Sequence, residues 1–195
     1  MALVACKRSR KSANGERGQA LLEFLPVIAL LLVLAFGVIE CSYAIWQLEV
    51  ITALTREGSN LASRGAGLPC PAAPAACPPP SLTETLQASA NAVISDGAAL
   101  NLATNGEVIV TAVQNLSGTF TISGQITSGN FNASSKIGTG VNAVATLPAA
   151  ATATPIPNNS TIFVTEVFTK HSAITPLGAF VNFTMPTTLY DVAYF

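Results

Sequence analysis

Residues 17–32 read RGQALLEFLPVIALLL, an apolar run that nevertheless carries a carboxylate, Glu23, shortly after a glycine, Gly18. Glu23 is the only charged residue between positions 19 and 39. At 1.5 Å per residue, a helix over residues 19–39 is about 31 Å long, enough to cross the hydrocarbon core of a bilayer. A carboxylate that faces lipid at a helix centre costs roughly 2.5–3.5 kcal/mol. The stretch therefore predicts a transmembrane helix whose single acidic residue has a function.

The charge on either side of this run is uneven. The first 18 residues hold five basic residues against one acidic residue, whereas residues 19–195 hold four basic and nine acidic residues. Basic residues that flank a membrane helix stay on the cytoplasmic side. We therefore expect residues 1–18 to be a basic cytoplasmic leader and the rest of this single-pass protein to be extracytoplasmic. A basic run also suits a solvated tail or a nucleic-acid contact, but no second basic cluster supports nucleic-acid binding.

Residues 40–64 keep a helical pattern after the apolar run. Tyr43 and Trp46 fall where an aromatic belt meets the outer headgroups, and Gly65 and Gly67 are stop signals. The sequence predicts one long helix over residues 19–64, transmembrane over 19–39 and facing a domain in its second half. The side chains expected on the domain-facing surface recur at three- and four-residue steps: Ile45, Leu48, Ile51 or Thr52, Thr55 and Ser59, and also Val50, Leu54 and Leu61.

Residues 65–80 form a Pro/Cys linker that contains the sequence CPAAPAAC, bounded by Cys70 and Cys77. Outside the cytoplasm these two thiols can form a disulfide. Pairing cannot be read from a sequence, so a disulfide and two free thiols both stay open. The spacing differs from the CxxC of zinc and redox sites, and the single histidine supplies no second ligand set. We expect no metal and no cofactor.

Residues 81–195 are expected to form an extracytoplasmic α+β domain. Ser81 and Glu84 fit a capping box that begins a second helix, which ends near Gly97. Alternating residues predict an antiparallel sheet of three or four strands. The single histidine, His171, is expected at the surface or half-buried. The predicted strands lie at residues 107–114, 119–126, 161–171 and 187–195, the first two joined by a turn at 115–118.

The order of basic head, Gly18, Gln19, Glu23 and Phe24 resembles a class III signal peptide of the type IV pilin superfamily. The resemblance implies that a prepilin peptidase cuts between Gly18 and Gln19 on the cytoplasmic side. It also implies assembly roles for Glu23 and Phe24, with Glu23 beside the new α-amino group of a neighbouring subunit. Opposite charges buried in an apolar bundle offset part of each other's cost, and a wrong register leaves both unpaired.

Two further stretches narrow the resemblance. Gly37 with Ile39-Glu40 near the membrane exit, and TREGSNLASRG at residues 55–65, look like the TadE-like family of pseudopilins from the tight-adherence (Flp, type IVb) pilus system. Arg56, Glu57 and Gly58 match an element that follows the membrane helix in that family, while Asn60 stands where an arginine is common. The resemblance implies a pilin-like domain. It suggests subunit contacts for Arg56, Glu57 and Gly58, with a solvated helix face as the alternative.

The resemblance implies a minor pilin or pseudopilin that acts in pilus assembly or initiation, with adhesion as a binding variant. The expected location is the bacterial inner membrane, and also the pilus at the cell surface. The implied partners are the prepilin peptidase, other pilins and the inner-membrane assembly platform. The alternatives are an uncleaved anchor, or a secretory signal cut after Ala44, each carrying an extracytoplasmic binding domain.

An enzyme is not expected. The sequence contains no nucleophile elbow with its partner residues, no metal-ligand cluster and no phosphate loop. The carboxylates are scattered singly along the chain, including Asp96 and Asp191, which a hydrolase would have to bring together.

Overall fold

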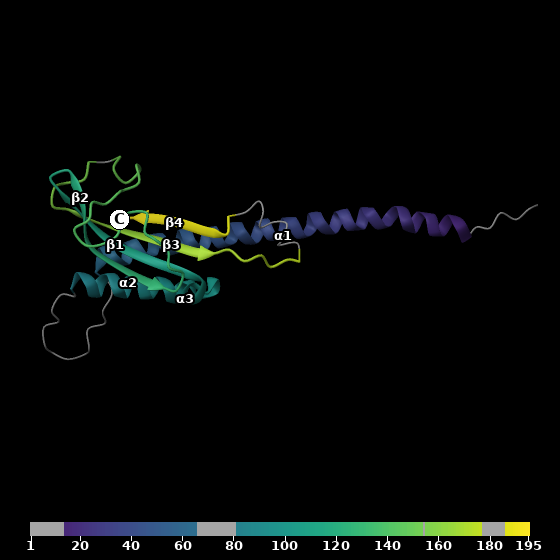
Figure 1. Ribbon diagram of the computed structural model, residues 1–195, viewed down its shortest axis with the longest axis horizontal. Helices are drawn as coiled ribbons and strands as arrows, with labels where there is room; N and C mark the ends of the chain where they lie inside the picture. The colour runs from purple at the N-terminus through teal and green to yellow at the C-terminus, as the bar shows by residue number, and fades with distance from the viewer. Residues whose placement is uncertain (1–13, 66–80, 154, 177–185) are drawn as a thin grey trace, which may run out of the picture.

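The computed structural model describes residues 14–65, 81–153, 155–176 and 186–195. A long helix, α1 (Asn14–Arg64), extends from an α+β unit formed by the later part of the chain (Figure 1). The other elements are α2 (Leu82–Asp96), the short helices η1 (Gly97–Leu100) and α3 (Leu102–Asn105), and the strands β1 (Gly106–Leu116), β2 (Thr119–Gly129), β3 (Thr161–Lys170) and β4 (Thr188–Tyr194). This arrangement confirms the predicted fold class. The predicted linker cysteines, Cys70 and Cys77, lie outside the described residues.

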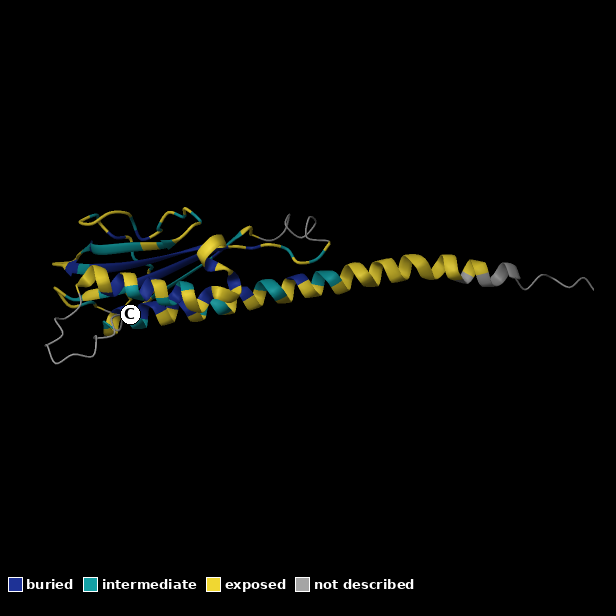
Figure 2. Cartoon of the chain, turned by 90° about the horizontal axis from the view of Figure 1, so that it is seen from below, coloured by how far each residue is buried: buried dark blue, intermediate teal, exposed yellow. Residues whose placement is uncertain are grey.

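Helix α1 is continuous through Pro26 and ends before Gly65, whose φ of +61° is a conformation that glycine adopts at little cost. It begins at Asn14, earlier than the predicted start at Gln19. The most apolar 18-residue window of α1 has a mean hydropathy of 2.7 and is not buried at all. Figure 2 shows the exposed first half and the buried stripe of the second half. By length and composition, α1 is able to cross a membrane.

The second half of α1 packs on the sheet, but its buried stripe differs in part from the predicted one. Ile51, Leu54, Thr55 and Ser59 are buried as predicted. Ile45 and Leu48 are exposed, which corrects the prediction for these two residues. The contacting stripe follows the 3.6-residue period back from Ile51, so Gln47 and Glu40 occupy it in their place.

Helix α2 begins at the predicted capping box. The Ser81 hydroxyl accepts a hydrogen bond from the Glu84 backbone N–H, and the Glu84 carboxylate accepts one from the Ser81 backbone N–H. These hydrogen bonds from Ser81 lower the pKa of Glu84. The helix ends at Asp96, directly before Gly97, as predicted. Its buried apolar side chains, Leu86, Ala90 and Val93, belong to the core between the helices and the sheet.

The four strands form an antiparallel sheet with the order β2-β1-β3-β4, so β4 lies at an edge as predicted. The predicted turn between β1 and β2 is present. Ser117 and Gly118 both have positive φ, as in a type I′ hairpin turn, and the Asn115 side-chain oxygen accepts a hydrogen bond from Gly118 N–H. β1 lies in the middle of the sheet, and its first eight residues are all buried.

The sheet has a core on each face. The helices cover one face, where Val108 and Val110 of β1 and Val167 of β3 pack in one cluster with α1 and α2 residues. The connection over residues 130–160 has no helix or strand in its described part, yet it covers the other face. Its Ile137 and Ala145 pack with Val113, Ile122 and Val164. Coverage on both faces explains why the central strands read as nearly continuous apolar runs.

Candidate functional site

The predicted processing and assembly residues lie on the exposed first half of α1. Gly18 is exposed, and a Cβ added there would meet nothing within 4 Å. Gln19 donates a hydrogen bond from Nε2 to Glu23 Oε1 at 3.2 Å, one helical turn away. Phe24 is also exposed. All four residues are thus accessible to another protein, and the roles assigned to them stay predictions.

The Arg56-Glu57-Gly58 element is divided between two environments. Arg56 and Glu57 are exposed, whereas Gly58 is buried. A Cβ added at Gly58 would lie 2.8 Å from the Cγ2 atoms of both Thr165 and Val93. Gly58 therefore lets α1 lie close to β3 and α2 within the same chain. The subunit contact suggested for the three residues stays a prediction, and the exposed pair is the part that another chain can reach.

Ser59 and Thr55 join α1 to the edge of the sheet. The Ser59 hydroxyl accepts a hydrogen bond from the Thr165 backbone N–H at 3.1 Å and donates one to the Ala193 carbonyl at 2.9 Å. Thr165 and Ala193 are cross-strand partners in the β3–β4 pair, so Ser59 bridges the two strands. One turn earlier, the Thr55 hydroxyl donates to Asp191 Oδ2 at 2.8 Å. Sequence reasoning missed this contact because hydroxyls on a helix are usually solvated or bonded to their own backbone.

Glu40 forms the second polar contact between α1 and the sheet domain, at the end of the apolar run. Its carboxylate is fully buried and accepts hydrogen bonds from the backbone N–H groups of Ile174 and Thr175, each at 3.1 Å. These residues belong to the connection that follows β3. Two donors partly replace the water that a buried carboxylate loses, so Glu40 holds this connection on α1.

His171 completes the cluster around Glu40. Its Nδ1 lies 2.6 Å from Gln47 Oε1, and its Nε2 lies 3.7 Å from Glu40 Oε1. The imidazole is buried, so the prediction of a surface or half-buried histidine was wrong. The reason is that α1 passes directly over the end of β3, and no local pattern on the strand reveals this. Glu40 and Gln47 did leave a signal in the sequence, because both lie on the helical stripe of Ile51.

Glu166 and Glu107 hold the long connection on the opposite face of the sheet. Glu166 is fully buried and accepts hydrogen bonds from Lys136 N–H at 2.8 Å, from Tyr190 O–H at 3.1 Å and from the Ser135 hydroxyl. Burial and the nearby Glu166 charge raise the pKa of Tyr190. Glu107 accepts a hydrogen bond from the Ala133 N–H. Both carboxylates are therefore occupied in holding residues 133–136.

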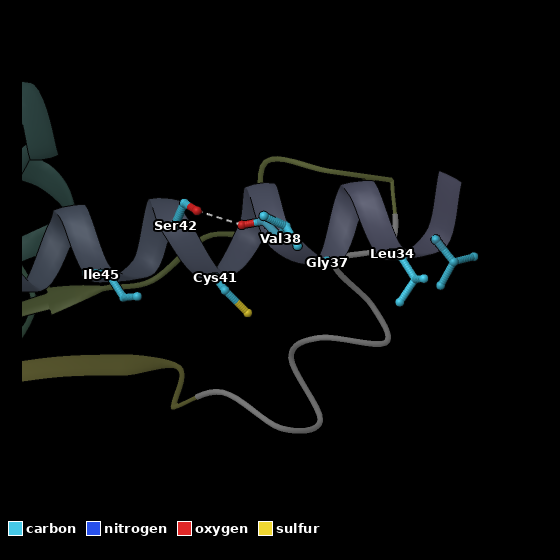
Figure 3. Close-up of a pocket in the computed structure, with 7 residues that line it drawn as sticks. Leu34, Gly37, Val38, Cys41, Ser42 and Ile45 are labelled. Carbon is cyan, nitrogen blue, oxygen red and sulfur yellow. Dashed lines mark hydrogen bonds between the residues drawn. The ribbon is translucent and has the colours of Figure 1, made fainter. Parts of the chain in front are cut away.

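A shallow groove with an apolar lining runs along α1 on both sides of Glu40. Leu34, Cys41 and Ile45 point to the same side of the helix, and the Ser42 hydroxyl bonds back to the Val38 carbonyl at 2.8 Å (Figure 3). The groove is lined by Val33, Leu34, Gly37, Val38, Cys41, Ser42 and Ile45. Exposed apolar surface thus continues past Glu40 to Ile45.

Within the described ranges, no three His, Cys, Asp or Glu side chains come together in a way that suits a metal ion. Asp191, which sequence reasoning considered as one of two hydrolase carboxylates, accepts the hydrogen bond from Thr55. Asp96 is exposed at the end of α2. The polar groups described above serve to hold the helix and the connections on the sheet.

These features define a class of protein: an α+β domain fixed to the second half of one long helix, whose first half is apolar and exposed. The family model described as TadE-like protein matches residues 18–60. The chain is thus similar to TadE-like proteins over α1, which is consistent with a TadE-like pilin of the tight-adherence system, a structural component of a pilus. No curated protein and no solved structure matches the chain. The matched residues include Glu40, Gln47, Thr55 and Ser59, whose partners on β3, on β4 and in the connection between them lie outside the match.

Proposed function

We propose that this chain is a minor pilin or pseudopilin of a tight-adherence pilus, inserted in the inner membrane with its domain outside the cytoplasm. One observation carries the proposal. The TadE-like segment, residues 18–60, coincides with a helix that is exposed and apolar in its first half and packed on the sheet in its second. A helix of this kind holds a domain at a membrane and also offers a free apolar surface to neighbouring helices.

The prepilin peptidase is the proposed processing enzyme, and Gly18–Gln19 is the proposed bond. Glycine weakens a helix by about 1 kcal/mol relative to alanine, so the chain at Gly18 unwinds into a protease cleft more easily than its neighbours. The exposure of both residues supports this role. After the cut, Gln19 carries the new α-amino group.

Glu23 is proposed to pair with that α-amino group on an adjacent subunit. Among the residues that the structure describes, its carboxylate pairs with the neutral amide of Gln19. A cation from a second subunit is therefore a stronger partner in an apolar bundle. Pairing of this kind sets the axial register of one helix against the next and recruits subunits to the assembly platform.

The alternative of a secretory signal cut after Ala44 agrees less well with the contacts. Such a cut separates Glu40 from the connection that it holds, and leaves His171 beside Gln47 alone. The uncleaved anchor keeps every contact and differs from the proposal only at Gly18–Gln19. Adhesion through the sheet domain is a further role that fits an extracytoplasmic domain, with no residue assigned to it.

The test is the N-terminus of the mature protein, measured by mass spectrometry of membrane fractions from cells with and without the peptidase. A start at Gln19 that depends on the peptidase supports the proposal. Gly18→Val should block the cut, while Gly15→Val, in the same leader, should not. A start at Ile45 contradicts the proposal in favour of a secreted domain, and an intact leader in both strains leaves a membrane anchor.

Assembly is tested separately with Glu23→Ala. The variant should be cut and inserted normally, yet pili recovered from the cell surface should be lost or strongly reduced. Glu49→Ala is the matched control, because Glu49 is an exposed carboxylate on the domain-facing half of the same helix. Normal piliation with Glu23→Ala would show that this carboxylate has no part in assembly.

A further inference from the structure

Residues 171–176, the described start of the connection between β3 and β4, lie beside α1 near its apolar half (Figure 1). After Lys170 its described residues leave the sheet and run alongside α1 toward the helix N-terminus (Figure 1). Ile174 and Thr175 are held there by Glu40, the first residue after the predicted span. A rigid helix fixes the depth of whatever is bound to it. The position of Glu40 therefore sets the position of Ile174.

The depth of these residues follows from helix geometry. Residues 19–39 span about 31 Å, the hydrocarbon thickness, and the helix rises about 9 Å from Glu40 to Trp46. A bilayer is about 40–45 Å thick with both headgroup layers, so each layer is about 5–7 Å thick. If residues 19–39 fill the hydrocarbon, Glu40 lies at the inner edge of the outer headgroups, Tyr43 close to their outer edge and the Trp46 backbone about 2–4 Å beyond it. Long side chains on a helix point back toward its N-terminus, so we expect the Trp46 ring to reach the headgroups.

The side chains at this depth suit a headgroup layer. Ile45 and Trp46 on α1 are exposed, as is Ile174 on the connection, which is 57% exposed despite its apolar side chain. Tyr43 stacks on Trp46 with ring centroids 5.6 Å apart, and lies 6.2 Å from the His171 ring. Tyrosine and tryptophan favour this region because their rings are apolar and their polar ends reach water.

Glu40 holds the connection against α1 in this arrangement. At this level the Glu40 carboxylate is fully buried and receives two backbone hydrogen bonds from the connection. The same bonds present Ile174 outward. The Glu40 charge is therefore buried, and the apolar side chain of Ile174 is exposed at the surface beside it.

We propose that Tyr43, Ile45, Trp46 and Ile174 form an interfacial patch through which the domain rests on the outer phospholipid headgroups, and that Glu40 holds Ile174 in it. The occupant is the lipid surface, because the patch is continuous with the apolar half of α1 that the bilayer is proposed to cover. The inference rests on that membrane placement. It adds a second segment, far from α1 in sequence, to the membrane contact.

The test uses the full chain in vesicles of phosphatidylethanolamine and phosphatidylglycerol that contain lipids brominated at shallow or deep positions. Trp46 is the only tryptophan, so a Trp46→Phe background permits one reporter at a time. The reporters are Ile174→Trp in the patch, Leu31→Trp in the span, and Leu116→Trp, an exposed position beside the β1–β2 turn. Circular dichroism checks that each variant is folded.

Shallow bromines should quench Ile174→Trp, deep bromines should quench Leu31→Trp, and Leu116→Trp should respond only to acrylamide in solution. Adding Glu40→Ala should abolish the lipid quenching of Ile174→Trp and leave Leu31→Trp unchanged. If Leu31→Trp is quenched and Ile174→Trp responds to acrylamide alone, the patch faces water and the inference is wrong. If neither lipid nor acrylamide reaches Ile174→Trp, a protein covers it, which also overturns the inference. Loss of quenching at Leu31→Trp instead refutes the membrane placement itself.

Discussion

The hydroxyl of Ser59 lies between two strands and accepts a hydrogen bond from the backbone N–H of Thr165 at 3.1 Å. It donates a hydrogen bond to the carbonyl of Ala193 on the neighbouring strand. One helix side chain therefore supplies both the acceptor and the donor at a single position of the β3–β4 pair. Near its end, the TadE-like segment is thus hydrogen-bonded to both β3 and β4.

Ser59→Ala should lower the free energy of unfolding by about 1–3 kcal/mol, because it removes the two hydrogen bonds that the Ser59 hydroxyl makes with the β3–β4 pair. The measurement is denaturant unfolding of the full chain in detergent, followed by near-ultraviolet circular dichroism. Ser63→Ala is the control, since the exposed Ser63 hydroxyl donates a hydrogen bond to Asn60 O in its own helix. Equal stability of the two variants would contradict the bridging role.

Gly58→Ala should destabilise the protein, although alanine is favoured over glycine in a helix by about 1 kcal/mol. The new methyl group would lie 2.8 Å from Thr165 Cγ2 and Val93 Cγ2, and both neighbours are β-branched and cannot move aside easily. Overpacking of this kind costs about 1–3 kcal/mol.

A double-mutant cycle separates this clash from other effects of the methyl group. Thr165→Ala removes Cγ2 and Oγ1, two of the three atoms that lie within 3.0 Å of the added methyl group, so Gly58→Ala should cost less in that background. Unchanged cost in the double mutant would mean that contact with Thr165 does not limit the size of residue 58.

Glu166→Gln should release the β2–β3 connection, residues 130–160, from the face of the sheet opposite the helices. The carboxylate accepts three hydrogen bonds, and an amide replaces one acceptor oxygen by a donor. We expect a loss of about 1.5–3 kcal/mol in stability and faster hydrogen exchange at the Lys136 amide. Glu57→Gln, at an exposed carboxylate, should leave that exchange rate unchanged.

The free energy of unfolding should fall at alkaline pH because the Tyr190 phenol is half-buried. Burial, followed by the charge of Glu166, raises the pKa of Tyr190, so the folded state holds the phenol neutral. The unfolded chain ionises near pH 10, and this contribution is therefore present below about pH 10 and is lost as the pH rises further. The stability difference between wild type and Tyr190→Phe should shrink above that pH. A difference that stays constant with pH would contradict this linkage.

Local patterns predicted most of the elements. The apolar run predicted the first half of α1, the serine-glutamate pair at positions 81 and 84 predicted the start of α2, and alternation predicted four strands near their observed bounds. These features depend on hydrogen bonds and side-chain periods within a few residues. The β2–β3 connection over residues 130–160 could not be predicted in this way. Its described part lacks a repeating backbone pattern, and carboxylates on β1 and β3 hold it.

Composition and period along the chain are enough to predict a long helix with an apolar first half, its lone carboxylate at Glu23 and the α+β class. The buried face of the second half depends on where the sheet meets the helix, so the three-dimensional fold was needed to identify it. It placed Glu40 beside His171, and Ser59 beside Thr165, across more than a hundred residues of chain. Such pairs form when distant backbone groups lose water together, and no local pattern records that requirement.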